Sequence, residues 1–181
     1  MTNPARLLTY DDLARLPSDG RRREIIEGAL VVSPVPSPAH QRVVGNVLME
    51  LWPGANAAGE LFVGPVDVVL SPSDVVEPDL VYLDRSVLHF VTERAIKCVP
   101  TLVIQMLSPG SIDTDRAAKL NLYARFGVPY YWIVDPIART IEGLVLTSGR
   151  YHLTTRLGAG TSGALTPFED VALDIDALLP A

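Results

Sequence analysis

The sequence contains one cysteine among its 181 residues, so the chain cannot close a disulfide within itself. It has no apolar stretch near the roughly 20 residues that a membrane-spanning helix requires. Its first residues lack the basic and then apolar segments that mark a signal peptide. These absences favour a protein that does not enter a membrane and that is located in the cytoplasm.

Positive charge is also scarce, because 15 lysine and arginine residues face 21 aspartate and glutamate residues and leave a net charge of −6. This charge excludes a broad basic surface that binds nucleic acid through counterion release alone. A local basic cleft remains compatible with it. The basic run 21–23 could contact phosphates, although three basic residues together are more typical of a solvated turn.

The apolar periodicity and the turn-forming residues predict one domain over residues 1–181, long enough to bury a core. We expect helices at 9–16, 40–52 and from about 113 to 126, strands at 61–70, 75–83, 101–107 and 130–135, hairpins at 23–32 and 140–154, and a short element within 171–179. Pro53 and Gly54 should end the second helix, and the strands at 61–70 and 75–83 should pair. This order predicts an α/β protein in the broad sense (α+β), with a mixed β-sheet flanked by helices and β-hairpins added at both ends.

Three polar residues on successive elements suggest chemistry. Gln105 is the one polar side chain in the run 102–107, whose lack of alternation is typical of a strand buried on both faces. A buried amide costs roughly 1–3 kcal/mol unless it is hydrogen-bonded, so Gln105 needs polar partners or a cleft. Asp79 lies at the start of another apolar strand, and Lys119 lies on the predicted helix that follows. An acid, a polar strand residue and a lysine in this order outline a metal-dependent phosphodiesterase.

Six short segments carry a resemblance over most of the chain. They are EIIEG at 24–28, SP through PAH at 33–40, VEPDL at 76–80, LVIQMLSP at 102–109, KLNLY at 119–123 and YWIVD at 131–135. Together, in this order, they resemble a large restriction-endonuclease-like family of the PD-(D/E)XK nuclease superfamily. The resemblance implies a restriction-endonuclease-like fold in which an aspartate and a glutamate on the next strand bind a divalent ion, and a lysine on the following helix assists. Those positions are Asp79, Gln105 and Lys119 here, so a glutamine replaces the glutamate.

This replacement weakens the metal site that the resemblance implies. Mg²⁺ prefers oxygen ligands in octahedral geometry and is usually held by one or two carboxylates, whereas Gln105 offers one neutral carbonyl oxygen. The backbone carbonyl of Met106 would add a ligand, and Lys119 would orient the attacking water or act as a point charge on the phosphate. Four side chains could supply the missing contact if the fold brings them near: Glu24, Glu27, His40 and Asp67. We therefore expect a nuclease that acts on nucleic acid, most simply DNA, and that binds Mg²⁺ or Mn²⁺ weakly.

Two other hypotheses fit the same residues. A catalytically inactive relative could bind nucleic acid or a partner protein through the same cleft, and a structural module could act mainly as a homodimer. The individual residues also have ordinary explanations. A glutamine in an apolar strand is more often a satisfied core amide than a ligand, Lys119 could form a surface ion pair with Asp115, and Asp79 could cap a turn.

Overall fold

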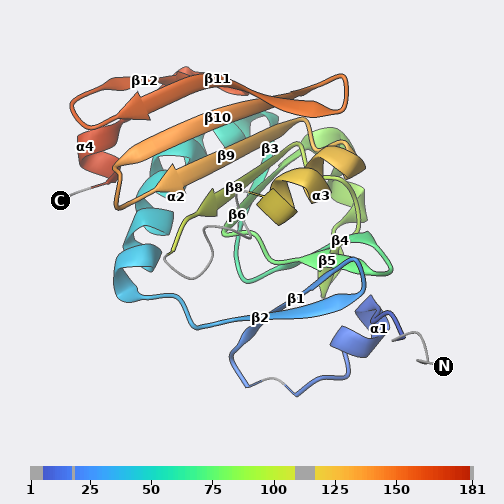
Figure 1. Ribbon diagram of the computed structural model, residues 1–181. Helices are drawn as coiled ribbons and strands as arrows, with labels where there is room; N and C mark the ends of the chain where they lie inside the picture. The colour runs from blue at the N-terminus through green and yellow to red at the C-terminus, as the bar shows by residue number, and fades with distance from the viewer. Residues whose placement is uncertain (1–5, 18, 109–116, 180–181) are drawn as a thin grey trace.

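The computed structural model describes residues 6–17, 19–108 and 117–179 (Figure 1). Its helices are α1 (Tyr10–Leu13), α2 (Pro38–Ala58), α3 (Lys119–Phe126) and α4 (Ile175–Leu178), and the 3₁₀ helix η1 covers Arg85–Phe90. The predicted turn at 108–111 and the predicted helix start near Asp113 lie largely outside the described residues, so only the second half of that helix can be compared. Among the described residues, no helix combines the length and apolar content needed to cross a membrane.

A six-stranded mixed sheet forms the centre of the molecule, in the order β11-β10-β9-β8-β6-β3. The neighbouring strands β8 and β9 are parallel, and the other neighbouring pairs are antiparallel. The strands are β3 (Gly59–Val63), β6 (Leu80–Asp84), β8 (Leu102–Met106), β9 (Tyr130–Asp135), β10 (Thr140–Thr147) and β11 (Arg150–Gly158). This sheet confirms the predicted strands at 101–107 and 130–135 and the predicted hairpin at 140–154.

A second sheet of five strands has the order β2-β1-β5-β4-β7. Its strands are β1 (Arg22–Ile26), β2 (Ala29–Ser33), β4 (Asp67–Ser71), β5 (Asp74–Val76) and β7 (Ala95–Ile96), and β12 (Ser162–Leu165) and β13 (Phe168–Asp174) form a separate pair near the C-terminus. The β1–β2 hairpin turns at Glu27 and Gly28, both with positive φ, as predicted from this pair of residues.

The two faces of the six-stranded sheet bury different cores. Along β8, Leu102, Ile104 and Met106 pack into a cluster with α2 and β13. The alternate residues Val103 and Leu107 pack into a second cluster with α3 and with strands of the five-stranded sheet. Figure 1 accordingly shows α2 behind the central sheet and α3 in front of it. A strand whose side chains pack into both clusters must be apolar on both faces, which explains why Gln105 is the one polar residue in this run.

The predicted strands at 61–70 and 75–83 do pair, but each one is two strands. The inner halves β4 and β5 pair within the five-stranded sheet, and the outer halves β3 and β6 pair within the central sheet. The breaks fall at Gly64-Pro65 and at Glu77-Pro78, where proline has no amide hydrogen to donate to a ladder. The predicted fold class, a mixed β-sheet flanked by helices, is confirmed, and one long hairpin passes from the central sheet to the second sheet, a division that the sequence did not predict.

The predicted end of the second helix at Pro53 is also wrong. Helix α2 continues to Ala58 with Pro53 inside it, although an internal proline typically costs about 3 kcal/mol. The last turns bury Leu51 and Ala55 in the core beside β13, and Gly54 lies against Val171. Packing of this apolar face outweighs the tendency of Pro53 and Gly54 to end the helix.

Candidate active site

Asp79 lies at the break between the two sheets. It directly precedes β6, it is 5% exposed, and its backbone carbonyl accepts a hydrogen bond from the amide of Gly64 across the break in the other strand, at 2.8 Å. A Cβ on Gly64 would approach the Pro78 carbonyl to 2.4 Å, so only glycine fits there. The change of sheet therefore fixes the position of the carboxylate.

Both carboxylate oxygens of Asp79 have partners. Oδ2 accepts a hydrogen bond from the backbone amide of Met106 at 2.8 Å, while Oδ1 lies 2.9 Å from Nη1 of Arg22 and 3.1 Å from Nε2 of His40. Burial would raise the pKa of Asp79, but the hydrogen bond from His40, the charge of Arg22 and the Met106 amide together lower it below its ordinary value. Asp79 is thus a buried anion at neutral pH.

Gln105 lies one residue from this contact. The register pairs Leu80 with Ile104, so continuing it by one residue sets Asp79 opposite Gln105. The side chain of Gln105 is 1% exposed, and its Nε2 donates a hydrogen bond to the Tyr123 hydroxyl on α3, at 3.3 Å. Tyr123 is thus the polar partner that the buried amide of Gln105 requires, and position 105 lies opposite Asp79.

Lys119 begins α3 and forms a buried ion pair with Glu24; Asp115, the surface partner that the sequence suggested, lies outside the described residues. Nζ of Lys119 lies 2.9 Å from Oε1 of Glu24 on β1, and both side chains are less than 5% exposed. The same Glu24 oxygen accepts a hydrogen bond from the backbone amide of Glu77, at 2.8 Å. Glu24, one of the four accessory candidates, therefore links the helix that carries Lys119 to the segment that carries Asp79.

Arg22 completes this network, and sequence reasoning missed it as a site residue. Arg22 and Glu24 are two residues apart on β1 and so share one face of the strand. The guanidinium bonds to Asp79 and donates to the Glu77 backbone carbonyl, and its Nε lies 3.7 Å from Oε2 of Glu77. The available signal was the charged residues at alternate positions of a strand that also carries the buried Ile25 and the partly buried Ile26. A continuous set of contacts therefore joins Lys119, through Glu24, Glu77 and Arg22, to Asp79.

Glu77 is the second residue that the sequence did not single out. Burial, together with the charges of Asp67 and Glu24, raises its pKa to about 7 against the opposing charge of Arg22. Its Oε2 is buried and has no hydrogen-bond partner among the described residues. A carboxyl in this state exchanges its proton near neutral pH.

This proton predicts a pH-dependent stability. A carboxyl whose pKa is higher in the folded protein than in the unfolded chain stabilises the fold fully below its unfolded value, near 4.5, and this contribution is lost as the pH rises through 7. As the pH rises from about 4.5 to about 7, the unfolding free energy of the wild type should therefore fall by on the order of 3 kcal/mol more than that of Glu77→Gln. Urea unfolding at a series of pH values measures the difference. The exposed Glu50→Gln is the control and should follow the wild type; parallel curves for wild type and Glu77→Gln would contradict the assignment.

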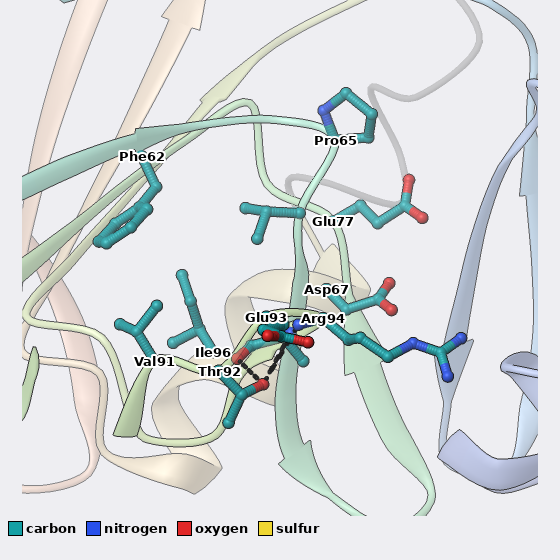
Figure 2. Close-up of a pocket in the computed structure, with 11 residues that line it drawn as sticks. Phe62, Pro65, Asp67, Glu77, Val91, Thr92, Glu93, Arg94 and Ile96 are labelled. Carbon is teal, nitrogen blue, oxygen red and sulfur yellow. Dashed lines mark hydrogen bonds between the residues drawn. The ribbon is translucent and has the colours of Figure 1, made fainter. Parts of the chain in front are cut away.

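Two of the accessory candidates lie outside this network. Glu27, at the β1–β2 turn, is 69% exposed and pairs with Arg125, so the structure does not bring it to Asp79. Asp67 lies in a neighbouring pocket of about 360 Å³, where Figure 2 shows its carboxylate beside the Arg94 side chain and Glu77 on the same wall. Burial raises the pKa of Asp67, and Arg94 opposes that shift. His40 is the accessory candidate that contacts Asp79 itself.

The donor set fits a hard divalent ion only in part. Within residues 6–17, 19–108 and 117–179, no three His, Cys, Asp or Glu side chains lie close enough to hold an ion together. Asp79 is an ionised carboxylate of the kind that Mg²⁺ prefers, and oxygen donors of Gln105 and Met106 belong to the adjoining strand. The set therefore offers one anionic side chain and two neutral oxygen donors, with the guanidinium of Arg22 2.9 Å from Asp79 Oδ1.

Comparisons with known proteins agree with this fold. No curated protein matches the sequence. The chain is similar in structure to a protein from Anabaena variabilis ATCC 29413 whose crystal structure is titled as "a putative nuclease belonging to DUF820", with a TM-score of 0.72, 18% sequence identity and coverage of 95% of this chain and 97% of that one. At this identity the likeness shows a shared fold. The model of the Uma2 family, described as "Putative restriction endonuclease", matches residues 10–176. The resemblance noted from the six sequence segments is therefore confirmed, and this chain belongs to the Uma2 family.

Proposed function

We propose that this protein is a metal-dependent nuclease that hydrolyses phosphodiester bonds in nucleic acid, most simply DNA, with a site weakened by Gln105. One observation carries the proposal. An ionised aspartate directly before β6 contacts the backbone of β8 and is joined by a chain of contacts to a buried lysine. Carboxylate, adjoining strand oxygens and lysine are the groups that such a hydrolysis needs.

Each residue has a distinct task in this proposal. Asp79, Gln105 and the carbonyl of Met106 would hold a Mg²⁺ or Mn²⁺ ion. When bound, that ion supplies a polarised phosphate and a more acidic water. Lys119, held in place by Glu24, places a fixed positive charge where the phosphate gains negative charge. His40 and Arg22 hold the Asp79 carboxylate in one orientation through Oδ1.

A second function is favoured by the same contacts. Both oxygens of Asp79 are already hydrogen-bonded within the protein. An ion can therefore bind there only if the side chain of Arg22 or His40 moves away from the carboxylate. A catalytically inactive relative that binds nucleic acid or a partner protein has no such requirement. A cytoplasmic location and assembly as a homodimer remain predictions that accompany either function.

A cleavage assay tests the first function. We expect slow nicking of supercoiled plasmid and slow cutting of single-stranded DNA with Mn²⁺, less with Mg²⁺, and none with EDTA. Asp79→Asn keeps the size of the side chain and removes its charge, so it should abolish the residual cleavage. Cleavage that survives in Asp79→Asn would show that another site or a contaminant is responsible. Absence of cleavage on every substrate, with binding retained, would favour the inactive relative.

A further inference from the structure

The groove next to the candidate site gathers arginines in a protein whose net charge is negative. A cavity of about 320 Å³ is lined by four arginines, which we call the arginine groove: Arg21, Arg22, Arg23 and Arg94. The whole chain has 15 basic residues and a charge of −6. This cluster of arginines therefore contrasts with the negative net charge of the molecule and marks a place where an anion is attracted.

The arginine groove is continuous with the cleft of Asp79. A smaller cleft of about 180 Å³ is lined by Asp79 and shares Gly20, Arg22 and Pro65 with the groove. On its other side the groove shares Arg94 and Asp67 with the pocket of Figure 2. A strand that places one phosphate at Asp79 would therefore lead into the groove with its neighbouring phosphates.

The four arginines are not equally free to bind. Arg22 is held by Asp79, and Nη2 of Arg23 lies 2.6 Å from Asp19. Arg21 lies 3.6 Å from Asp19 and keeps 66% of its side chain exposed. Arg94 is exposed, and within the described part of the chain its guanidinium forms no ion pair, although its charge acts on the nearby Asp67. Arg94 and Arg21 are the available donors.

We propose that the arginine groove binds backbone phosphates of the nucleic-acid strand that flanks the reacting phosphate, with Arg94 and Arg21 as the donors. This inference rests on the proposed function for the choice of partner. A guanidinium presents a planar fork of donors that matches two phosphate oxygens. Asp67 and Glu77 also line the groove and repel an anion, so the phosphates lie at the arginine rim and not over the carboxylates.

Asp67 allows a test in the opposite direction, because loss of an arginine should weaken binding and loss of this carboxylate should strengthen it. Binding of a labelled single-stranded oligonucleotide to the full chain is measured in EDTA by fluorescence anisotropy, between about 50 and 200 mM salt. Arg94→Gln and Arg21→Gln should each weaken binding about tenfold and reduce the slope of log affinity against log salt by about 0.7 per lost contact. Asp67→Asn should strengthen binding, because it removes a negative charge from the same groove.

A matched variant separates local contact from net charge. Arg150→Gln removes the same charge at the exposed β10–β11 turn, on the central sheet and away from β1 and α1 in Figure 1. It should leave binding near the wild-type value. The proposal is overturned if Arg150→Gln weakens binding as much as Arg94→Gln, if the wild type does not bind at low salt, or if poly-glutamate displaces the oligonucleotide as well as unlabelled oligonucleotide does. Because EDTA prevents cleavage, loss of the groove and loss of the nuclease function give different results.

Discussion

Gln105→Glu should cleave DNA at least about tenfold faster than the wild type in Mn²⁺. The substitution adds a carboxylate of nearly the same size opposite Asp79, where the strand register sets position 105. In the proposed metal site Asp79 is the one anionic ligand, so a second carboxylate should strengthen ion binding. Initial rates of plasmid nicking at equal protein and metal concentrations measure the gain.

The same variant should show a characteristic response of stability to metal. Position 105 is 1% exposed, so an added carboxylate is poorly solvated and close to Asp79, and the metal-free variant should melt at a lower temperature than the wild type. Metal that binds the native state alone stabilises it, by roughly 2.7 kcal/mol at a hundredfold excess over the dissociation constant. The rise in melting temperature with Mn²⁺ should therefore be larger in Gln105→Glu than in the wild type, and absent in Asp79→Ala.

The control for this prediction lies in the same cleft. Gln41 lines the cleft of Asp79 from the first turns of α2, so Gln41→Glu adds the same charge beside the site without placing it on β8. It should change the cleavage rate and the rise in melting temperature with Mn²⁺ much less than Gln105→Glu does. Equal gains in both variants would mean that added charge, and not a ligand at 105, is responsible. Equal cleavage in wild type and Gln105→Glu would show that the 105 side chain is not a ligand.

Lys119→Met should lower the unfolding free energy by about 3–5 kcal/mol, the usual result of removing one partner of a buried ion pair. The cost arises because Glu24, 2% exposed, would keep its charge without the ammonium 2.9 Å away. Chemical denaturation of the purified variant measures it. Arg6→Gln, which removes an ion pair whose arginine is 75% exposed, is the control and should leave the stability close to that of the wild type.

A double variant distinguishes the charge effect from a packing effect. Glu24→Gln keeps an oxygen that can accept the Glu77 amide but removes the negative charge. Combined with Lys119→Met, it should recover a large part of the lost stability, since neither charge then remains buried alone. If the double variant is as unstable as the sum of the two single variants, the ion pair is not the cause of the loss.

Local patterns sufficed for four strands of the central sheet, β8 to β11. The strand at β8 and the hairpin of β10 and β11 are predicted by apolar runs and turn residues that are contiguous in the sequence. The break of one hairpin at two prolines and the passage of α2 through Pro53 were not predicted. In both cases the outcome depends on packing against segments far along the chain: a second sheet in the first case, β13 in the second.

The sequence by itself determined the family through its six segments, and it determined that Asp79, Gln105 and Lys119 follow in order, with a glutamine at the position where the family resemblance implies a glutamate. Only the tertiary structure decided how these residues are connected. Arg22 meets Asp79 across 57 positions of sequence, and His40 meets it across 39. Residue type and spacing predict which groups share a strand face, because strand geometry is local. They do not predict which strands distant in the sequence meet, because that choice depends on burying both faces of the central sheet at once.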